Sequence, residues 1–584
     1  MSGAQSQPSA KGRRDLRRHK GANEKRPRRH LSRKALIRDL TGLCAGAVGF
    51  IFSVPPAVLI PDNVDWLLGE DPASAYLGWE FFRRDEWRIP LGANPRFGLE
   101  NASSIVYSDS LPILALPSKL FSSFVAGPFQ YFGAWLLICF LLQGIFSARL
   151  LGRFTLGPLP TLFGSLLACF LPFHLCRLSY GYGHIALFGH FLILAALLLS
   201  LEKTKFPTRR WTLLLGASLG IHAYLFFMVA VFCAFQLVGL RNVRLTSRIA
   251  SGSVVSSVVL LISWTLGYFE IDVRDAAMSV GGFRAHPASL IGSLARGGIS
   301  WSHTYVTSNL SGDGEGFVFL GLGAISLIAL SVVIRITTCY ERWVVSSARV
   351  SDTRTRRPAF SPSTYLAASV LAILSLRPVV VFGSAELRIP IPQMLAGALD
   401  PFRANGRFLW PLAYVLLFAG LAAFASKSQR VIAFVFVGAL FLQIVDSSGA
   451  RSIGYEKLAE GYNYFPSKRA WLDEALNNSP LEIDSIRVPG SSILKPISSD
   501  RSELWFDLAN FALENSLTTN FVYTARSPSP DSAKFGSIEH YLRDLTPKYL
   551  LIIAEEDLEG LQAQRTLDHW HISEKDGLLA LSPR

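Results

Sequence analysis

Long apolar runs recur along this chain and constrain its fold more than any other feature. A helix needs about 20 mainly apolar residues to cross a bilayer, and many of the runs approach that length. Half of the 584 residues are hydrophobic, and the mean hydropathy is +0.32. Backbone groups inside a bilayer must hydrogen-bond to one another, so such runs fold as helices. The sequence therefore predicts an all-α polytopic membrane protein.

The charges of the loops predict the path of the chain, because cytoplasmic loops carry an excess of Lys and Arg. The basic loops are 202–210, 241–248, 342–357 and 427–430. Placing all of them inside predicts eleven spans, an N-terminus in the cytoplasm and a C-terminus in the periplasm. The predicted spans are 36–60, 129–150, 156–175, 185–201, two within 211–240, 249–269, 317–336, 363–382, 409–424 and 432–445.

The apolar block 211–240 is too long for one upright span and too short for two full ones. Basic loops flank the block on both sides, so it must cross an even number of times. We expect two short helices that turn near His222-Ala223-Tyr224. Short helices at membrane depth usually line a polar cavity, since their freed backbone groups need partners.

The two ends of the chain differ from this apolar middle. Residues up to Arg38 include 13 Lys or Arg against two acids, in a segment almost free of large apolar residues. We expect residues 1–35 to be a disordered basic cytoplasmic tail that touches anionic lipid, with no role in binding nucleic acid. Residues 36–446 form the transmembrane domain, and residues 447–584 a small periplasmic α/β domain, with a strand at 549–553 and a helix at 470–477.

The cysteines give no sign of a metal or disulfide framework. All six lie in or at the ends of apolar segments, without zinc-ligand spacing. They are Cys44, Cys139, Cys169, Cys176, Cys233 and Cys339.

The first outer loop, 61–128, holds the main candidate site residues. Carboxylates and aromatics at a membrane surface suit an amphipathic substrate and acid–base or metal chemistry. Asp71 and Asp109 are the candidate catalytic acids, although each also sits where an acid could cap a helix. Glu70, Arg83 and Arg84 are candidate substrate contacts in the same loop. An interfacial helix with a solvated acidic face is the structural alternative.

Three further candidates lie in later outer loops. His184 could bind a phosphate or a sugar hydroxyl, whereas His190 fits a hydrogen-bonded position between spans. Arg403 and Arg407 are four residues apart, so a helix would place both guanidinium groups on one face. Such a pair suits a lipid phosphate, and snorkelling to the interface is the alternative.

Several motifs together resemble a family of uncharacterised bacterial integral membrane proteins grouped with the GT-C type of membrane glycosyltransferases. The resemblance covers about residues 40–450. Its motifs are Gly-Glu-Asp-Pro at 69–72, Leu-Gly-Trp-x-Phe-Phe-Arg at 77–83, Trp-x-x-Pro-Leu-Gly-x-Asn-Pro at 87–95, Tyr-Ser-Asp-Ser-x-Pro at 107–112, Phe-Gln-Tyr-Phe-Gly-x-Trp at 129–135, and residues 179–184, 189–190, 221–224, 315–317 and 402–408.

The resemblance implies an enzyme of the bacterial inner membrane. Such an enzyme would transfer a sugar from a polyprenyl-phosphate donor to an envelope glycan, lipid or protein acceptor on the periplasmic face. The resemblance places the reactive acid at Asp71, with Glu70 beside it and Asp109 as a second acid. These acids would act as a general base or hold a divalent cation, Mg²⁺ or Mn²⁺. A non-catalytic lipid or glycan transporter of the same architecture is the rival interpretation.

Overall fold

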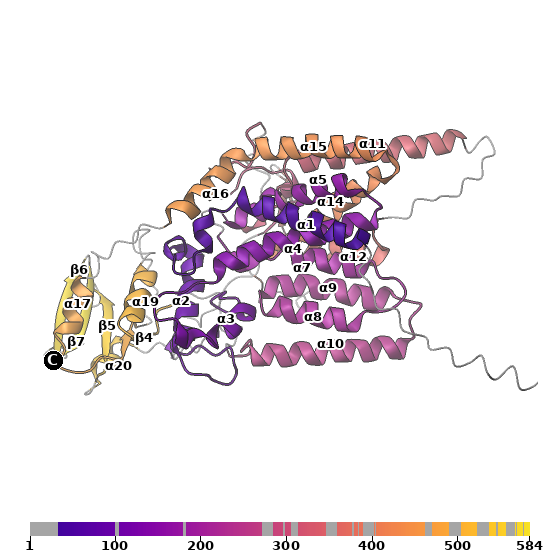
Figure 1. Ribbon diagram of the computed structural model, residues 1–584. Helices are drawn as coiled ribbons and strands as arrows, with labels where there is room; N and C mark the ends of the chain where they lie inside the picture. The colour runs from indigo at the N-terminus through magenta and orange to yellow at the C-terminus, as the bar shows by residue number, and fades with distance from the viewer. Residues whose placement is uncertain are drawn as a thin grey trace, which may run out of the picture. The chain divides into compact units, whose positions relative to one another are not determined.

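The fold is mostly helical, with a small sheet near the C-terminus (Figure 1). The chain divides into two compact units, residues 1–37 and 38–584. The predictions for residues 1–32 lie outside the described part. The computed structural model describes residues 33–99, 104–178, 183–270, 284–295, 298–304, 314–345, 359–376, 379–382, 385–388, 402, 404–461, 470–489, 504–522, 537–544, 547–555, 567, 569–575 and 577–584.

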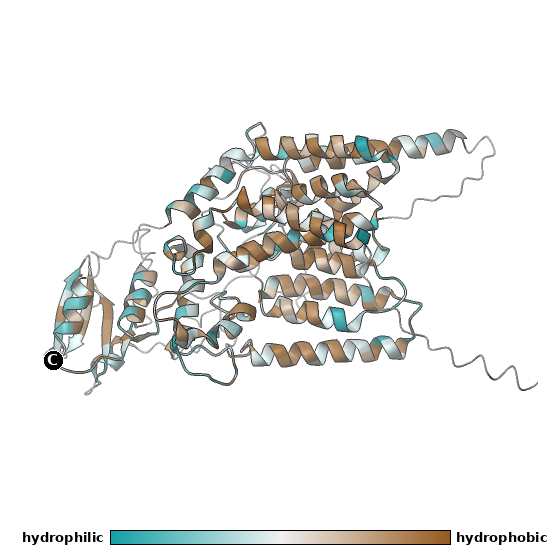
Figure 2. Cartoon of the chain, viewed as in Figure 1, coloured by the Kyte–Doolittle hydropathy of each residue, from teal (hydrophilic) through white to brown (hydrophobic). Residues whose placement is uncertain are grey.

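The apolar segments form helices that pack side by side (Figure 1). Helix α4 packs against α5 and α7, α8 packs against α9 and α10, and α11 packs against α14 and α15. Apolar residues colour most of their length in Figure 2. The helices are α1 Arg33–Ile51, α4 Phe132–Arg153, α5 Pro158–Cys169, α7 Phe191–Ser200, α8 Thr208–Leu219, α9 Ala223–Gly239, α10 Leu245–Thr265, α11 Leu322–Val345, α12 Pro362–Ser375, α14 Trp410–Ala423 and α15 Gln429–Asp446.

Within the described residues, five helices are long and apolar enough to cross a membrane. They are Phe132–Arg153, Leu245–Thr265, Leu322–Glu341, Asn405–Ser426 and Gln429–Asp446. A sixth span would arise if Pro158–Cys169 and Pro172–Leu178, bent by 46°, crossed together. This result is consistent with a membrane protein, but it does not support eleven full-length spans.

The other predicted spans contain shorter helices or, for 36–60, helix α1, which ends at Ile51 and is not among the five. Each of the eleven predicted segments contains a helix, yet α7, α8, α9 and α12 have 17 residues or fewer. The prediction for 363–382 is wrong at its end. Helix α12 stops at Ser375, and Val379–Phe382 forms strand β1, paired antiparallel with β2 Ala385–Arg388. β-Branched valines favour that extended backbone over a last helical turn.

The prediction of a break within the block 211–240 is confirmed. Helix α8 ends at Leu219 and α9 begins at Ala223. The backbone N–H of Ile113, in the first outer loop, donates to the carbonyl of Gly220 at 2.8 Å. The break therefore supplies a backbone acceptor that an unbroken helix would not expose.

Two glycines allow α1 and α4 to approach closely. A Cβ added at Gly42 would lie 2.6 Å from the carbonyl oxygen of Gly144, and one at Gly46 would lie 2.3 Å from that of Phe140. Gly42 and Gly46 are four residues apart and so share one face of α1. Small residues at this spacing let membrane helices pack backbone to backbone.

The first outer loop is held together by a buried ion pair network around Glu80. The loop contains η3 Asp65–Leu67, α2 Glu70–Arg84, α3 Pro112–Lys119 and η5 Ser122–Phe124, and η2 Pro56–Leu59 precedes it, because α1 ends at Ile51 and not at the predicted residue 60. The Glu80 carboxylate accepts from Arg83 Nε at 2.8 Å and from Arg84 Nη2 at 2.9 Å. It also accepts from the backbone N–H of Phe129 at 3.2 Å, which ties α2 to the entry of α4.

The C-terminal region is a five-stranded sheet in the order β4-β3-β5-β7-β6. Strand β3 pairs parallel with β4 and β5, and β7 pairs antiparallel with β5 and β6. The predicted strand at 549–553 and helix at 470–477 are confirmed. The elements are α16 Ser448–Glu460, α17 Ala470–Asn477, β3 Ser485–Arg487, α19 Leu504–Glu514, β4 Thr518–Thr519, α20 Ile538–Leu542, β5 Tyr549–Ala554, β6 Trp570–Lys575 and β7 Leu578–Pro583.

The sheet and the first outer loop are in direct contact. Arg84 Nη1 donates to the carbonyl of Leu513 at 3.1 Å, and Arg96 Nη2 donates to that of Ser516 at 2.9 Å. Phe97 forms a parallel β-bridge with Thr519 of strand β4. The loop that carries the candidate acids is therefore fixed both to the helices and to the sheet.

Candidate functional site

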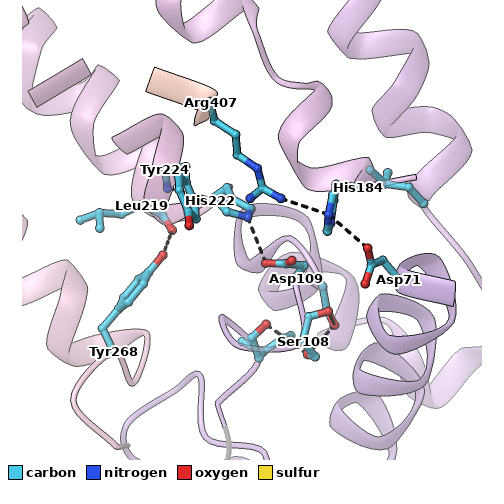
Figure 3. Close-up of polar contacts among 12 residues, drawn as sticks. Asp71, Ser108, Asp109, His184, Leu219, His222, Tyr224, Tyr268 and Arg407 are labelled. Carbon is cyan, nitrogen blue, oxygen red and sulfur yellow. Dashed lines mark hydrogen bonds and ion pairs between the residues drawn. The ribbon is translucent and has the colours of Figure 1, made fainter. Parts of the chain in front are cut away.

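Charged side chains from five separate segments meet where several helices begin or end, and Figure 3 shows three of them, Asp71, His184 and Arg407. Asp71 lies in the first turn of α2, and His184 precedes η7 Ile185–Phe188 and α7. The other three segments are short 3₁₀ helices: η6 Cys176–Leu178 with Arg177, η11 Gly314–Gly316 with Glu315, and η12 Asn405–Leu409 with Arg407.

Glu315 is the buried centre of this cluster. Its Oε2 accepts hydrogen bonds from Arg177 Nη1 and from Arg407 Nε, the latter at 3.0 Å. Arg177 is fully buried, and the side chains of Glu315 and Arg407 are each 7% exposed. Burial raises the pKa of Glu315, but Arg177, Arg407 and His184 outweigh it and hold the pKa well below its ordinary value. Glu315 is therefore a fixed anion that neutralises buried guanidinium groups and does not act as an acid.

Two glycines explain why η11 and η12 can bring Glu315 and Arg407 together. A Cβ added at Gly316 would lie 1.9 Å from the carbonyl oxygen of Arg284, and one at Gly406 would lie 2.7 Å from the Cα of Gly316. Both distances are far inside van der Waals contact. The glycine next to each charged residue thus allows the two backbones to touch.

The guanidinium groups of Arg407 and Arg177 each stack on an aromatic ring. The guanidinium carbon of Arg407 lies 4.7 Å from the ring centroid of Tyr224, and that of Arg177 lies 4.9 Å from that of Trp410. Stacking of this kind favours Arg over Lys, because the guanidinium group is planar and weakly hydrated.

Asp71 reaches the cluster through His184. Its Oδ2 lies 3.1 Å from His184 Nε2, and its side chain is 30% exposed. The capping alternative for Asp71 is wrong: α2 begins at Glu70 rather than at Pro72, and Gly69 is the N-cap. The carboxylate is thus bound on one side and open to a ligand on the other.

His184 Nε2 has three neighbours at the same distance. It lies 3.1 Å from Asp71 Oδ2, from Glu315 Oε1 and from Arg407 Nη2. A ring nitrogen carries either a proton or a lone pair, so it cannot satisfy carboxylates and a guanidinium group together. The two carboxylate oxygens favour a proton on Nε2. In that tautomer Arg407 Nη2 has no acceptor in His184 and can donate to an added anion.

Asp109 is held by a second histidine. Its Oδ1 lies 3.4 Å from His222 Nε2, and its side chain is 28% exposed. His222 caps α9: its Nδ1 accepts from the backbone N–H of Tyr224 at 3.1 Å. Because Nδ1 is an acceptor, the proton of neutral His222 is on Nε2, where it can donate to Asp109.

The electrostatics of this pair favour a charged aspartate and a neutral histidine. Burial raises the pKa of Asp109, but its interactions with His222, His184 and Arg407 lower the pKa by more. Burial lowers the pKa of His222, although Asp109 opposes that change. Near pH 7 the structure therefore presents an ionised Asp109 beside a neutral imidazole of fixed tautomer.

The backbone at Asp109 is in the left-handed region. Its φ is +56°, and that of Leu111 is +53°. The turn is fixed by Ser110 Oγ, which donates to the carbonyl of Ala75 at 2.7 Å and lies 2.8 Å from Ser108 Oγ. A helix does follow this segment, but the capping alternative for Asp109 is wrong, since α3 begins at Pro112 with Leu111 as its N-cap. Strained backbone of this kind is common at functional sites.

The remaining candidate residues fall into two groups. Arg83 and Arg84 lie at the other end of α2, about 18 Å along the helix from Asp71, and bind Glu80 and backbone carbonyls. They hold the loop together and do not reach the cluster. The side chain of Glu70 and all of Arg403 lie outside the described residues. His190 Nδ1 lies 3.0 Å from the hydroxyl of Tyr414, as expected for a histidine between helices.

Sequence analysis missed three members of the cluster: Arg177, Glu315 and His222. His222 was assigned only to a turn, and Glu315 only to a motif. One signal was available, since each is an ionisable residue at the end of an apolar segment.

The cluster contains three carboxylates and two guanidinium groups, which leaves one net negative charge when both histidines are neutral. No group of three His, Cys, Asp or Glu in the described residues has the geometry of a metal site. The arrangement can accept a proton at Asp71 or Asp109, and it can bind an anion at Arg407. In Figure 3 the carboxylate of Asp71 points toward His184 and that of Asp109 toward His222.

Fold and cluster together define a helical protein with membrane-length apolar helices and a buried acid–histidine–arginine centre at the helix ends. The family model of the domain of unknown function DUF6311 matches residues 43–448, so the chain belongs to that family. The matched region contains every described member of the cluster. A search of curated proteins found no match to this chain.

Proposed function

We propose that this protein is a membrane glycosyltransferase of the GT-C type. It transfers a sugar from a polyprenyl-phosphate donor to an envelope glycan, lipid or protein acceptor on the periplasmic face. The observation that carries this proposal is a pair of partly exposed carboxylates, Asp71 and Asp109, beside Arg407. The three groups match what such a transfer needs: a proton acceptor and an anion site.

The carboxylate of Asp71 is the general base of the proposed reaction. It accepts the proton of the acceptor hydroxyl, whose oxygen forms a bond to the anomeric carbon of the donor sugar. The bond between that carbon and the phosphate oxygen breaks, and the lipid phosphate leaves with the electron pair. His184, 3.1 Å from Asp71 Oδ2, orients the carboxylate. Asp109, oriented by His222, is the second acid and would hold an acceptor hydroxyl.

Arg407 binds the leaving phosphate and offsets its negative charge. Its Nε is bound to Glu315, and its Nη2 loses His184 as an acceptor when His184 carries its proton on Nε2. That Nη2 can donate to a phosphate oxygen without breaking the ion pair that neutralises the buried guanidinium group. Hydrogen bonds between charged groups are the strong ones, so Arg407 is well placed to bind and stabilise the phosphate.

The proposal includes an eleven-crossing path in the inner membrane, with the N-terminus cytoplasmic and the C-terminus periplasmic. Two observations support it. Basic loops alternate with the helices along the chain, and the cluster lies at the starts of α7, α9, α11 and α14. Helices too short to span alone can cross where neighbouring helices satisfy their ends.

The test compares lipid-linked sugars and surface glycans in wild-type cells, a deletion strain and strains that express Asp71→Asn or Asp109→Asn at normal levels. We expect a sugar-charged polyprenyl phosphate to accumulate and one glycan to lose that sugar in the deletion strain and in both variants. Unchanged lipid-linked sugars and glycans would refute the proposal. A glycan that is mislocalised but chemically complete would identify a transporter instead.

A further inference from the structure

A cavity of about 770 Å³ runs along the helices, and its arginine-lined rim lies at the opposite end from the acid–histidine–arginine cluster. Its walls come mainly from α4, α7 and α8. The lining residues are Arg38, Leu142, Phe146, Arg149, Arg153, Phe191, Leu192, Ala195, Leu198, Leu199, Arg210, Leu213, Leu214 and Ala217.

The order of residues along the helices separates the arginine rim of the cavity from the cluster. Arg149 and Arg153 lie at the end of α4 and Arg210 at the start of α8, whereas the cluster lies beyond the start of α7 and the end of α8. The apolar lining runs between them, along α7 from Phe191 to Leu199 and along α8 to Ala217. Arg210 precedes His222 by 12 residues, and nine of those steps lie within α8, a rise of roughly 14 Å. No residue of the cluster lines the cavity.

The lining has two chemically distinct parts. Ten of the 14 lining residues are Leu, Phe or Ala, and the other four are arginines; no carboxylate is among them. On the aromatic wall the rings of Phe146 and Phe191 stack with centroids 6.3 Å apart. Arg149 and Arg153 lie where α4 finishes, Arg210 lies where α8 starts, and Arg38 lies in the second turn of α1.

One of the arginines is held in place by a carboxylate outside the cavity. Arg149 donates to Asp39 through Nε at 3.0 Å and through Nη2 at 2.9 Å, and its Cζ lies 5.6 Å from the ring centroid of Phe146. Asp39 offsets only one of the four positive charges of the rim. The rim therefore keeps a positive charge next to an apolar chamber.

We propose that this cavity binds an anionic phospholipid of the surrounding bilayer. The phosphate lies against Arg153 and Arg210 at the rim, and an acyl chain lies along Phe146, Phe191 and Ala217. A free phosphate would leave the apolar walls unfilled, and a neutral lipid would leave the rim charges unpaired. The volume lies in the range of pockets that enclose small ligands, about 300–1,000 Å³, and basic pockets between membrane helices bind anionic lipid headgroups.

The experiment titrates the purified full-length chain with phosphatidylglycerol or phosphatidylcholine in the same detergent and counts bound lipid by native mass spectrometry. We expect phosphatidylglycerol to bind about tenfold more tightly, because charge-assisted hydrogen bonds to the phosphate favour the lipid with net negative charge. Arg153→Gln with Arg210→Gln should abolish that preference. Ala217→Phe should weaken binding of both lipids, since it fills the chamber without changing charge.

The matched control is Arg209→Gln with Arg241→Gln. These arginines are exposed at the same helix ends but do not line the cavity, so the preference should be unchanged. Three results would overturn the proposal: equal binding of the two lipids by the wild type, an equal loss in the control, or displacement of phosphatidylglycerol by millimolar inorganic phosphate. Retained preference for phosphatidylglycerol in the Arg153/Arg210 variant would also overturn the proposal. If that variant does not fold, Ala217→Phe still tests whether lipid occupies the cavity.

Discussion

Replacing Glu315 with Gln tests whether the buried cluster is organised as described. Glu315 Oε2 accepts from two arginines that are at most 7% exposed, and Oε1 lies 3.1 Å from His184 Nε2. Glutamine keeps the shape but leaves two buried guanidinium groups without their counter-charge. Removing one partner of a buried ion pair typically destabilises a protein by roughly 3–5 kcal/mol. We expect a loss of that size in thermal unfolding of the purified protein.

Glu80→Gln is a matched control, because Glu80 is also buried and also binds two arginines, Arg83 and Arg84. Arg84 is 40% exposed, so the loss of stability should be smaller than for Glu315→Gln. The two variants should differ in function. At a temperature where both are folded, only Glu315→Gln should weaken binding of a polyprenyl phosphate. An unchanged melting temperature for Glu315→Gln, or equal binding defects in both variants, would refute this account of the cluster.

Three further predictions concern individual positions. Asp71→Asn should lower sugar transfer by ~10²–10⁴-fold in an assay with purified protein, because an amide cannot accept the proton. The control Asp62→Asn, at an exposed position, should have no effect. Near-normal turnover by Asp71→Asn would show that another residue is the general base. Arg407→Ala should weaken polyprenyl-phosphate binding about tenfold or more, and Arg407→Lys should restore only part of it; equal affinity in all three proteins would exclude the phosphate role. Gly406→Ala should lower the free energy of unfolding by about 1–3 kcal/mol, since the added Cβ would lie 2.7 Å from the Cα of Gly316. At the control position Gly438 an added Cβ would have no atom within 4 Å, so Gly438→Ala should be neutral or stabilising by about 0.5–1 kcal/mol. Equal effects of the two changes would contradict the close backbone contact at Gly406.

The parts of the fold that sequence analysis predicted correctly depend on local patterns. The charges of the flanking loops and the length of the block 211–240 predicted the break before Ala223, and a short continuous apolar run predicted the strand at 549–553. Helix lengths were less predictable. Hydropathy measures whether a segment is apolar, but it does not show where the backbone stops being helical, as after Ser375.

The candidate site shows the same limit. Asp71 and Asp109 could be chosen because a cluster of acids in one outer loop is visible in the sequence. Glu315 and Arg177 could not be paired, since 138 residues separate them in the sequence. A buried ion pair between distant segments depends on how helices pack, and a single sequence carries no direct signal of that contact.

The contact between the first outer loop and the sheet has a consequence for self-association. Strand β4 lies at the edge of the sheet, where unpaired backbone groups normally invite another chain to add a strand. Here that edge is occupied, because Gly98 N–H donates to the carbonyl of Thr519 at 2.9 Å and Thr519 N–H donates to that of Arg96 at 3.4 Å. Deleting this loop would thus expose the unpaired backbone groups of strand β4, and the shortened protein should form intermolecular β-structure and aggregate. The loop that presents the acids also covers one edge of the protein's own sheet, the edge opposite strand β6.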